Sequence, residues 1–193
     1  VGAIAIIVIF QEDIRKFLYS WGAQLPMRVL KRLFSSKRTV ERDKNLLKKN
    51  TLPIVMACMS MSKGKVGALI VMERSMPLDD IVKTGDVIDA SVNQRLIENI
   101  FFKNSPLHDG AMVIADHRIK AAGCILPVSH NLDIPKELGL RHRAALGMSQ
   151  ESDSLCIIVS EETGGISTAR NGEFHLRLSA EELEAELTAA MEK

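Results

Sequence analysis

The sequence predicts an α/β (α+β) protein with a mixed central β-sheet flanked by helices, and three observations support this fold class. Residues 66–72 form a nearly continuous apolar run, as in a central strand that is covered on both faces. Asn171-Gly172 is a strong signal for a hairpin turn. The apolar residues within 93–102 recur at helical spacing. Together these elements indicate one main domain built on a sheet.

The other elements follow in chain order. A helical pattern over residues 11–34 is broken by Gly22 and Pro26, and residues 35–49 form a polar stretch typical of a solvated helix face or linker. Further helices are expected at 52–62, 141–150 and 179–191, the last opened by a capping box of Ser179 and Glu182. Further strands are expected at 87–90, 111–115, 119–125, 155–159, 165–169 and 174–178.

The N-terminal residues allow two interpretations. The ten apolar residues Val1–Phe10 are too few to cross a bilayer as a helix, which takes about 20 residues, and they lack the features of a signal peptide. They fit either a buried strand or the cut end of a membrane helix. We place an N-terminal helical segment at residues 1–35 and the main domain at residues 36–193.

Composition narrows the range of partners. The 25 basic and 24 acidic side chains give a net charge of +1, and aromatic residues make up 4% of the chain, so we expect no nucleic-acid partner. The three cysteines, Cys58, Cys124 and Cys156, fit no zinc-binding spacing. We expect them to be small buried residues in a reducing compartment.

A first candidate site motif surrounds Asp109. This carboxylate is followed by Gly110 and Ala111 at the start of a predicted strand, and glycine lets backbone N–H groups approach a ligand closely. His108 and Asp109 together can bind a divalent ion such as manganese. Taken alone, Asp109-Gly110 is also an ordinary turn.

A second candidate motif is the basic triplet Arg141, His142 and Arg143 at a predicted helix N-terminus. Basic side chains oppose the helix dipole there, and a bound phosphate would resolve that conflict. Taken alone, the polar loop 160–164 is an ordinary turn. If it lies near the basic triplet, Glu162 could orient an arginine or a metal-bound water. Because no candidate covalent nucleophile is evident, direct reaction between bound substrates is favoured.

These two motifs together resemble the diadenylate cyclase (DAC domain) family. Supporting stretches are residues 66–71, 102–108 and 160–164, and the resemblance covers about residues 50–174. Residues 8–11 and the basic helix after them resemble the membrane-anchored CdaA/DacA branch, in which transmembrane helices precede this point. This favours a trimmed membrane-proximal segment for Val1–Phe10, with the catalytic domain on the cytoplasmic side of the cell membrane.

The resemblance implies a DAC-domain fold and a nucleotidyltransferase that condenses two ATP into cyclic di-AMP and two pyrophosphates, with Mn²⁺, Mg²⁺ or Co²⁺. Each protomer of a face-to-face homodimer would hold one ATP. His108 and Asp109 would bind the metal, and Asp109 would also activate the attacking hydroxyl. The catalytic triplet Arg141, His142 and Arg143 would hold the triphosphate. The nucleotide-binding residues implied are Gly67, Ala68, Leu69, Gly110, Ala111, Ile125, Leu126, Leu140, Ser160 and Glu162.

Two residues depart from the family pattern. Leu140 stands where threonine is common, so a phosphate contact and a helix cap are lost, and Ile125 stands where an aromatic residue often stacks on adenine. We expect activity to survive both changes. Two alternatives remain: a non-catalytic adenine-nucleotide sensor on the same fold, and a scaffold whose basic N-terminal helices bind membrane or protein. Retention of Asp109 argues against the sensor, which needs no metal-activating carboxylate.

Overall fold

The computed structural model describes residues 51–129 and 138–191. All of them belong to one compact unit, Asn45–Lys193. The predicted N-terminal segment 1–35 and the boundary at residue 36 lie outside the described residues.

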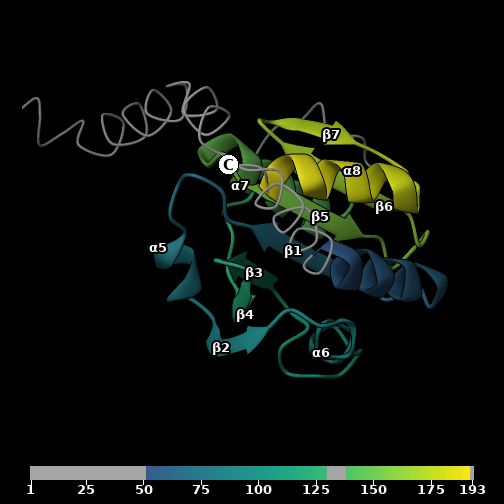
Figure 1. The fold of residues 1–193 in the computed structure, drawn as a ribbon, viewed down its shortest axis with the longest axis horizontal. Coiled ribbons are helices and arrows are strands. Elements are labelled where there is room, and N and C mark those ends of the chain that lie inside the picture. Colours follow the sequence, from purple (N-terminus) through teal and green to yellow (C-terminus); the bar gives the residue numbers. More distant parts are fainter. Residues whose placement is uncertain (1–50, 130–137, 192–193) are drawn as a thin grey trace, which may run out of the picture. The chain divides into compact units, whose positions relative to one another are not determined.

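The described residues form one mixed sheet of seven strands in the order β2-β4-β3-β1-β5-β6-β7 (Figure 1). β1 and β3 are parallel, and every other pair is antiparallel. The predicted mixed sheet is therefore confirmed, with β1 at its centre. The strands are β1 (Ala68–Met72), β2 (Asp86–Ser91), β3 (Ala111–Ala115), β4 (Arg118–Cys124), β5 (Leu155–Val159), β6 (Ile166–Arg170) and β7 (Glu173–His175).

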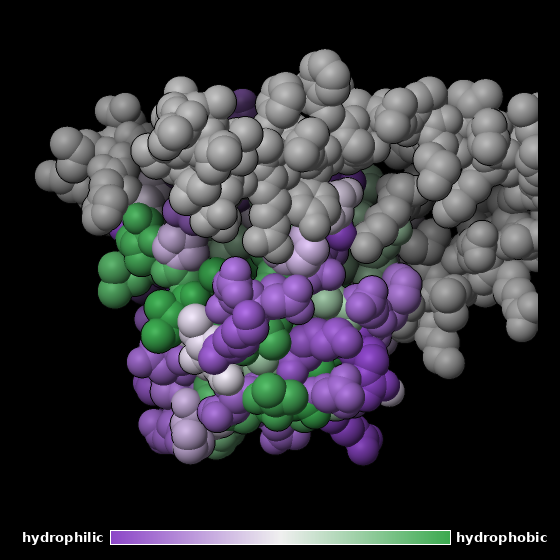
Figure 2. All heavy atoms as spheres, turned by 90° about the vertical axis from the view of Figure 1, so that its left-hand side faces the viewer, coloured by the Kyte–Doolittle hydropathy of each residue, from purple (hydrophilic) through white to green (hydrophobic). Residues whose placement is uncertain are grey.

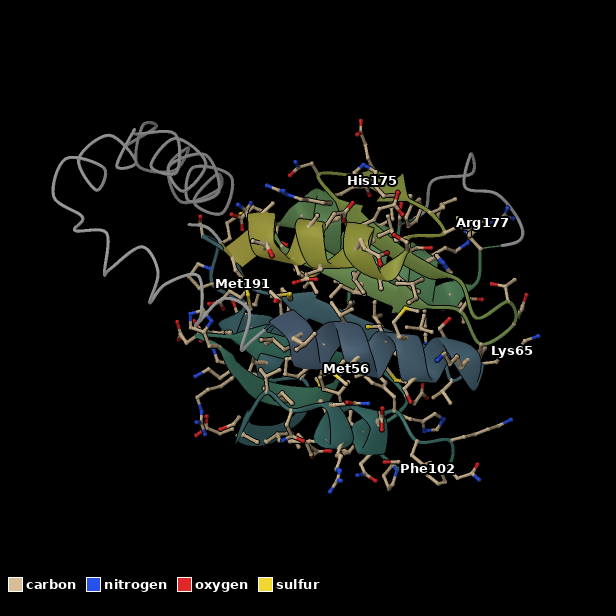
Figure 3. The ribbon with its side chains drawn as sticks, turned by 45° about the vertical axis from the view of Figure 1, so that its right-hand side comes forward. Met56, Lys65, Phe102, His175, Arg177 and Met191 are labelled. Atoms are coloured by element: carbon tan, nitrogen blue, oxygen red, sulfur yellow. The ribbon has the colours of Figure 1, made fainter. Side chains whose placement is uncertain are left out.

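Helices cover both faces of the sheet, and the side chains of β1, which point alternately to the two faces, are therefore all buried. Ile70 packs in a core cluster with a helix over residues 51–63, α6 (Gln94–Ile100) and α8 (Ala180–Met191). Leu69 and Val71 pack in a second cluster with α5 (Asp79–Val82) and α7 (Leu140–Glu151). Figure 3 shows α8 and the helix at 51–63, marked by Met56, on the same side of the sheet.

Local signals predicted the turns and caps well. Asp116 and His117 have φ of 48° and 60°, and Asn171 and Gly172 have φ of 52° and 78°, as two-residue hairpin turns with positive φ require. The capping box also forms, since the Ser179 N–H donates to Glu182 at 2.8 Å and the Glu182 N–H donates to Ser179 Oγ at 3.2 Å.

Two differences from the predicted elements have local causes. The strand expected at 174–178 ends at His175, because Arg177 has φ of 58° and the Leu178 N–H donates to the Ile166 carbonyl at 2.8 Å. The short helix α5 was not predicted, since four residues are too few to show a helical period.

On the face turned to the viewer in Figure 2, hydrophobic side chains lie in small groups between hydrophilic ones. Across the described ranges no helix has the length and apolar character needed to span a membrane. The three cysteines are free and buried, as predicted, and burial raises the pKa of the Cys58 and Cys156 thiols to about 12.

Candidate functional site

Four strand ends meet at one edge of the sheet. Because β1 and β3 are parallel, their amino ends lie together, which brings Asp109 and Gly110 beside the start of β1. β4 and β5 run antiparallel to these strands, so their carboxyl ends reach the same edge, with Ala111 opposite Cys124 and Ala68 opposite Val159. Chain pairing therefore assembles residues that are far apart in the sequence.

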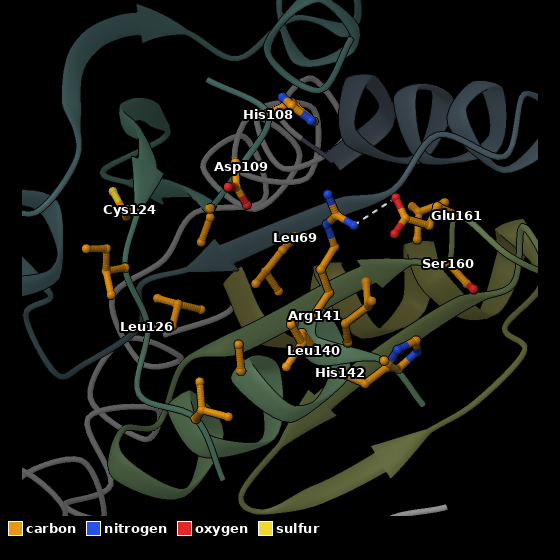
Figure 4. Close-up of a pocket in the computed structure, with 18 of the residues that line it drawn as sticks. Leu69, His108, Asp109, Cys124, Leu126, Leu140, Arg141, His142, Ser160 and Glu161 are labelled. Carbon is orange, nitrogen blue, oxygen red and sulfur yellow. Dashed lines mark ion pairs between the residues drawn. The ribbon is translucent and has the colours of Figure 1, made fainter. Parts of the chain in front are cut away.

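A cleft of about 770 Å³ opens at this edge, within the usual range for one small-molecule ligand. It lies between the strand ends and the start of α7 (Figure 4). The residues lining it are Leu69, His108, Asp109, Gly110, Ala111, Cys124, Ile125, Leu126, Val128, Gly139, Leu140, Arg141, His142, Ala144, Ile158, Val159, Ser160, Glu161 and Glu162.

Gly110 fixes how Asp109 enters the cleft. It has φ of +128°, and a Cβ at this position would lie 2.6 Å from the Gly123 carbonyl carbon. The start of β3 therefore contacts the end of β4 so closely that only glycine fits at position 110 without displacing backbone. The backbone next to Asp109 therefore packs directly against β4, and this packing fixes where the Asp109 carboxylate begins.

Arg141 is held against the start of β1. A Cβ on Gly67 would lie 2.7 Å from Arg141 Nη1, so the guanidinium occupies the space that a side chain would need. Arg141 Nη1 also forms an ion pair with Glu161 Oε2 at 3.1 Å (Figure 4). The Glu161 side chain is 63% exposed, and a pair of this kind is worth at most about 1 kcal/mol. Phosphate oxygens can therefore replace Glu161 at little cost.

His142 has a different environment from its two basic neighbours. It is 5% exposed, and its ring packs edge-on against Phe174 with 6.0 Å between centroids. Burial lowers the pKa of His142, an effect partly offset by the negative charge of Glu162. Figure 4 shows its ring directed away from Asp109. His142 therefore lines the cleft mainly as a neutral ring.

The amino end of α7 lines the cleft, through Gly139, Leu140 and Arg141. Gly139 is the N-cap residue and makes no side-chain cap hydrogen bond, and the first turn contains no acidic residue. We predicted that Leu140 costs the helix its cap, but the N-cap position is residue 139, because Leu140 is already the first helical residue. Leu140 is 77% exposed. The first N–H groups of such a helix have no partner within it and favour an anion.

The loop after β5 is docked on the helix at 51–63. The Ser62 hydroxyl donates to the Gly164 carbonyl at 2.5 Å, and Gly164 has φ of +76°. Its Cβ would lie 2.5 Å from the Ser62 carbonyl oxygen, so glycine is required there. This contact sets where Ser160, Glu161 and Glu162 stand at the cleft.

Most of the predicted site residues line this cleft, but three do not. Gly67 is not a lining residue, but it lies against two that are, Arg141 and Glu161. Ala68 is fully buried in the core cluster on the opposite face of the sheet, so its side chain does not line this cleft. Arg143 is half-buried and is not among the lining residues of the described chain, while its carbonyl accepts the Ser129 N–H at 3.1 Å.

Sequence reasoning missed several lining residues. Glu161 was not distinguished from its neighbour Glu162, because adjacent residues of one loop carry no periodic signal. Ala144 could have been found, since it lies four residues after Leu140 on one helix face. Cys124, Val128, Gly139, Ile158 and Val159 were also not predicted.

The charges lining the cleft favour a cation together with an anionic ligand. Among the lining residues of the described chain, Arg141 is the basic one, against the carboxylates Asp109, Glu161 and Glu162. The described residues contain no group of three or more His, Cys, Asp or Glu that could hold a metal. A divalent ion would therefore take His108 and Asp109 plus ligand phosphates and water, which is how Mg²⁺ is commonly bound. The donor set fits such a shared site.

Comparison with known proteins now identifies the family. Residues 55–174 match the family described as DAC, DisA bacterial checkpoint controller nucleotide-binding. The chain belongs to this family. This DAC-family chain is 43% identical over 192 residues to cyclic di-AMP synthase CdaA of Bacillus subtilis, covering 100% of the chain and 67% of that relative. It is 41% identical over 182 residues to diadenylate cyclase of Listeria monocytogenes, covering 94% and 63%.

Solved structures agree with the DAC assignment. The crystal structure of a double mutant of DacA from Staphylococcus aureus matches with a TM-score of 0.74 and 40% identity, covering 79% of this chain and 99% of that one. A hypothetical membrane spanning protein from Bacillus cereus matches with a TM-score of 0.64 and 29% identity, covering 92% and 97%. The predicted family, fold and enzyme class, nucleotidyltransferase, are confirmed. The chain spans about two thirds of the length of the two curated relatives.

Replacing Gly67 with alanine tests how Arg141 is held. We expect Gly67→Ala to weaken nucleotide binding about tenfold, or about 1.4 kcal/mol, because the new Cβ displaces the Arg141 guanidinium. The fold should survive, since the displaced atoms are the ends of flexible side chains. Gly64→Ala is the matched control, as its Cβ would make only ordinary contacts. Calorimetric titration giving equal affinities for the two variants would contradict this placement of Arg141.

The burial of His142 predicts a pH dependence. An unfolded histidine has a pKa of about 6.5, and the folded value lies below it, so the unfolded chain binds more protons at acidic pH. Stability from neutral His142 is thus present above pH 6.5 and is lost as pH falls through the folded pKa. Ring-proton NMR should give a pKa below 6.5 for His142, and the acid sensitivity of unfolding should be smaller in His142→Gln. A pKa at or above 6.5 would refute the prediction.

Proposed function

We propose that this DAC-family chain is the catalytic domain of a diadenylate cyclase, which condenses two ATP into cyclic di-AMP and two pyrophosphates. The observation that carries the proposal is that Asp109 and Arg141, from two distant motifs, line one cleft. The printed names of the Bacillus subtilis and Listeria monocytogenes relatives support the same activity.

The cleft offers separate surfaces for the base and for the phosphates. Apolar lining comes from Leu69 in β1, Ile158 in β5 and Leu126 just after β4. This surface suits the adenine ring. Arg141 and the free N–H groups at the start of α7 suit the phosphate oxygens. Ser160 and Glu162 would lie near the phosphates, from the docked loop after β5.

Catalysis is metal-dependent in this proposal, with Mn²⁺, Mg²⁺ or Co²⁺. The bound ion would neutralise part of the triphosphate charge. His108 and Asp109 would hold it together with the phosphates, and the carboxylates lining the cleft would otherwise repel a nucleotide. The nucleotide and the ion should therefore bind together.

Asp109 would orient and deprotonate the attacking hydroxyl. The 3′-oxygen of each ribose forms a bond to the α-phosphorus of the other nucleotide, its proton passes to a base, and pyrophosphate leaves with the electrons of the broken P–O bond. Two such transfers close the ring. The protein contributes position and charge rather than a covalent intermediate.

The two transfers are equivalent, so a two-fold symmetric pair of protomers is the simplest arrangement. Each cleft has a volume suited to one ligand, and an isologous dimer would place two clefts face to face. Ile125, Val128 and Leu140 line the cleft yet have exposed side chains, and an opposing protomer or a bound base would cover them. We propose a homodimer, or a larger assembly built from it, as the active form.

We further propose that the protein acts at the cell membrane, with this domain on the cytoplasmic side. The support is the similarity to CdaA of Bacillus subtilis and to the hypothetical membrane spanning protein from Bacillus cereus. ATP, the proposed substrate, is available on that side.

The test is to incubate the chain with ATP and Mn²⁺ and to resolve the products. We expect cyclic di-AMP, and we expect Asp109→Asn to lose at least about 100-fold in rate while nucleotide binding is largely kept. Asp116→Asn is the matched control, because Asp116 lies at the opposite end of β3 in an exposed turn and asparagine tolerates its φ of 48°. Binding without product for Mn²⁺, Mg²⁺ and Co²⁺ would reject the enzyme and favour a nucleotide sensor.

A further inference from the structure

In the turn just before Asp109, one carbonyl oxygen faces two nitrogens of the same residue. The Ser105 carbonyl oxygen accepts the backbone N–H of His108 at 3.2 Å and also lies 2.5 Å from Nδ1 of the His108 ring. A carbonyl oxygen can only accept hydrogen bonds, so the proton must be on Nδ1. In the neutral ring this leaves Nε2 as the nitrogen with a free lone pair.

The turn is built by groups other than the ring. Residues 105–108 form a β-turn with Pro106 at the second position, where its fixed φ is favoured. The Ser105 hydroxyl accepts the Leu107 N–H at 3.3 Å, which is a side-chain turn of its own. The Ser105 N–H in turn donates to the Phe102 carbonyl at 2.9 Å, tying the turn to the end of α6. The carbonyl that receives the His108 ring is thus already in place.

His108 lines the cleft, and its ring is half-buried. Ligating histidines commonly donate their other ring N–H to a backbone carbonyl, which fixes the tautomer and the ring orientation. The arrangement at Ser105 has this form. By contrast His117, in the exposed turn between β3 and β4, offers a solvated reference ring in the same chain.

We propose that Ser105 is a positioning residue whose carbonyl holds His108 in its Nδ1–H tautomer, so that the Nε2 lone pair is available to a divalent cation that arrives with the nucleotide. The inference rests on the proposed function for the role of the cation. The tautomer itself is a property of the metal-free chain and can be measured without any substrate.

The first experiment reads the tautomer by NMR. The full chain is labelled with ¹⁵N and studied without metal in alkaline buffer, so that the spectra report neutral imidazole rings. Long-range ¹H–¹⁵N spectra distinguish protonated from unprotonated ring nitrogens, and His108→Gln and His117→Gln assign the two rings. We expect one dominant tautomer for His108, protonated at Nδ1. An Nε2–H tautomer, or a mixture like that of His117, would overturn the proposal.

The second experiment loosens the turn while every cation ligand stays. Ser105→Ala combined with Pro106→Gly removes the hydroxyl acceptor and the fixed φ, and Pro106 is exposed, so the core is untouched. We expect mixed tautomers and about tenfold weaker Mn²⁺ binding, measured by EPR with an α,β-methylene analogue of ATP. Ser105→Thr keeps the hydroxyl and should match the unmodified chain. Unchanged Mn²⁺ affinity in the loosened variant would overturn the positioning role.

The two proposals fail in different ways. Suppose that His108 is in the Nδ1–H tautomer and that loosening the turn weakens Mn²⁺ binding, but that the chain makes no cyclic di-AMP. This result would overturn the proposed function and leave this inference standing. A chain that makes cyclic di-AMP with His108 in the other tautomer would do the reverse.

Discussion

The candidate site depends on one close approach, that of the start of α7 to the start of β1 and the end of β5. Gly67 leaves the space in which the Arg141 guanidinium lies, and Glu161 pairs with that guanidinium from the loop after β5. The loop is fixed in turn because Gly164 packs on the Ser62 backbone. The Arg141 guanidinium, which faces the cleft, is therefore placed by two glycines and by one ion pair with an exposed carboxylate.

The charge balance of the cleft explains why a cation and a nucleotide would bind as a unit. Carboxylates outnumber the single lining guanidinium, and His142 is mainly neutral because it is buried. A triphosphate alone would meet net repulsion from the side chains, opposed only by Arg141 and the amino end of α7. A divalent ion would offset the excess negative charge of these side chains.

Local sequence signals predicted much of this fold because the relevant interactions are local. The turns at Asp116-His117 and Asn171-Gly172 and the Ser179–Glu182 box involve neighbouring residues, and all three form. The Asp109 and Arg141 motifs were also predicted to act together. Their cleft lies at the amino ends of the parallel strands β1 and β3, whereas open α/β sheets usually bind ligands at carboxyl ends. Neighbouring strand residues such as Ala68 and Leu69 point to opposite faces, but only the packing of α7 shows that Leu69 is on its side of the sheet, and only that packing separates Arg141 from Arg143.

A crystal structure of the chain with Mn²⁺ and an α,β-methylene analogue of ATP would test the central claim most directly. We expect one nucleotide per cleft, with phosphates against Arg141 and the start of α7, and an anomalous Mn²⁺ peak beside His108 and Asp109. We also expect a second protomer facing the first across a two-fold axis. A nucleotide bound away from the cleft, or bound there with Mn²⁺ remote from both His108 and Asp109, would contradict the account.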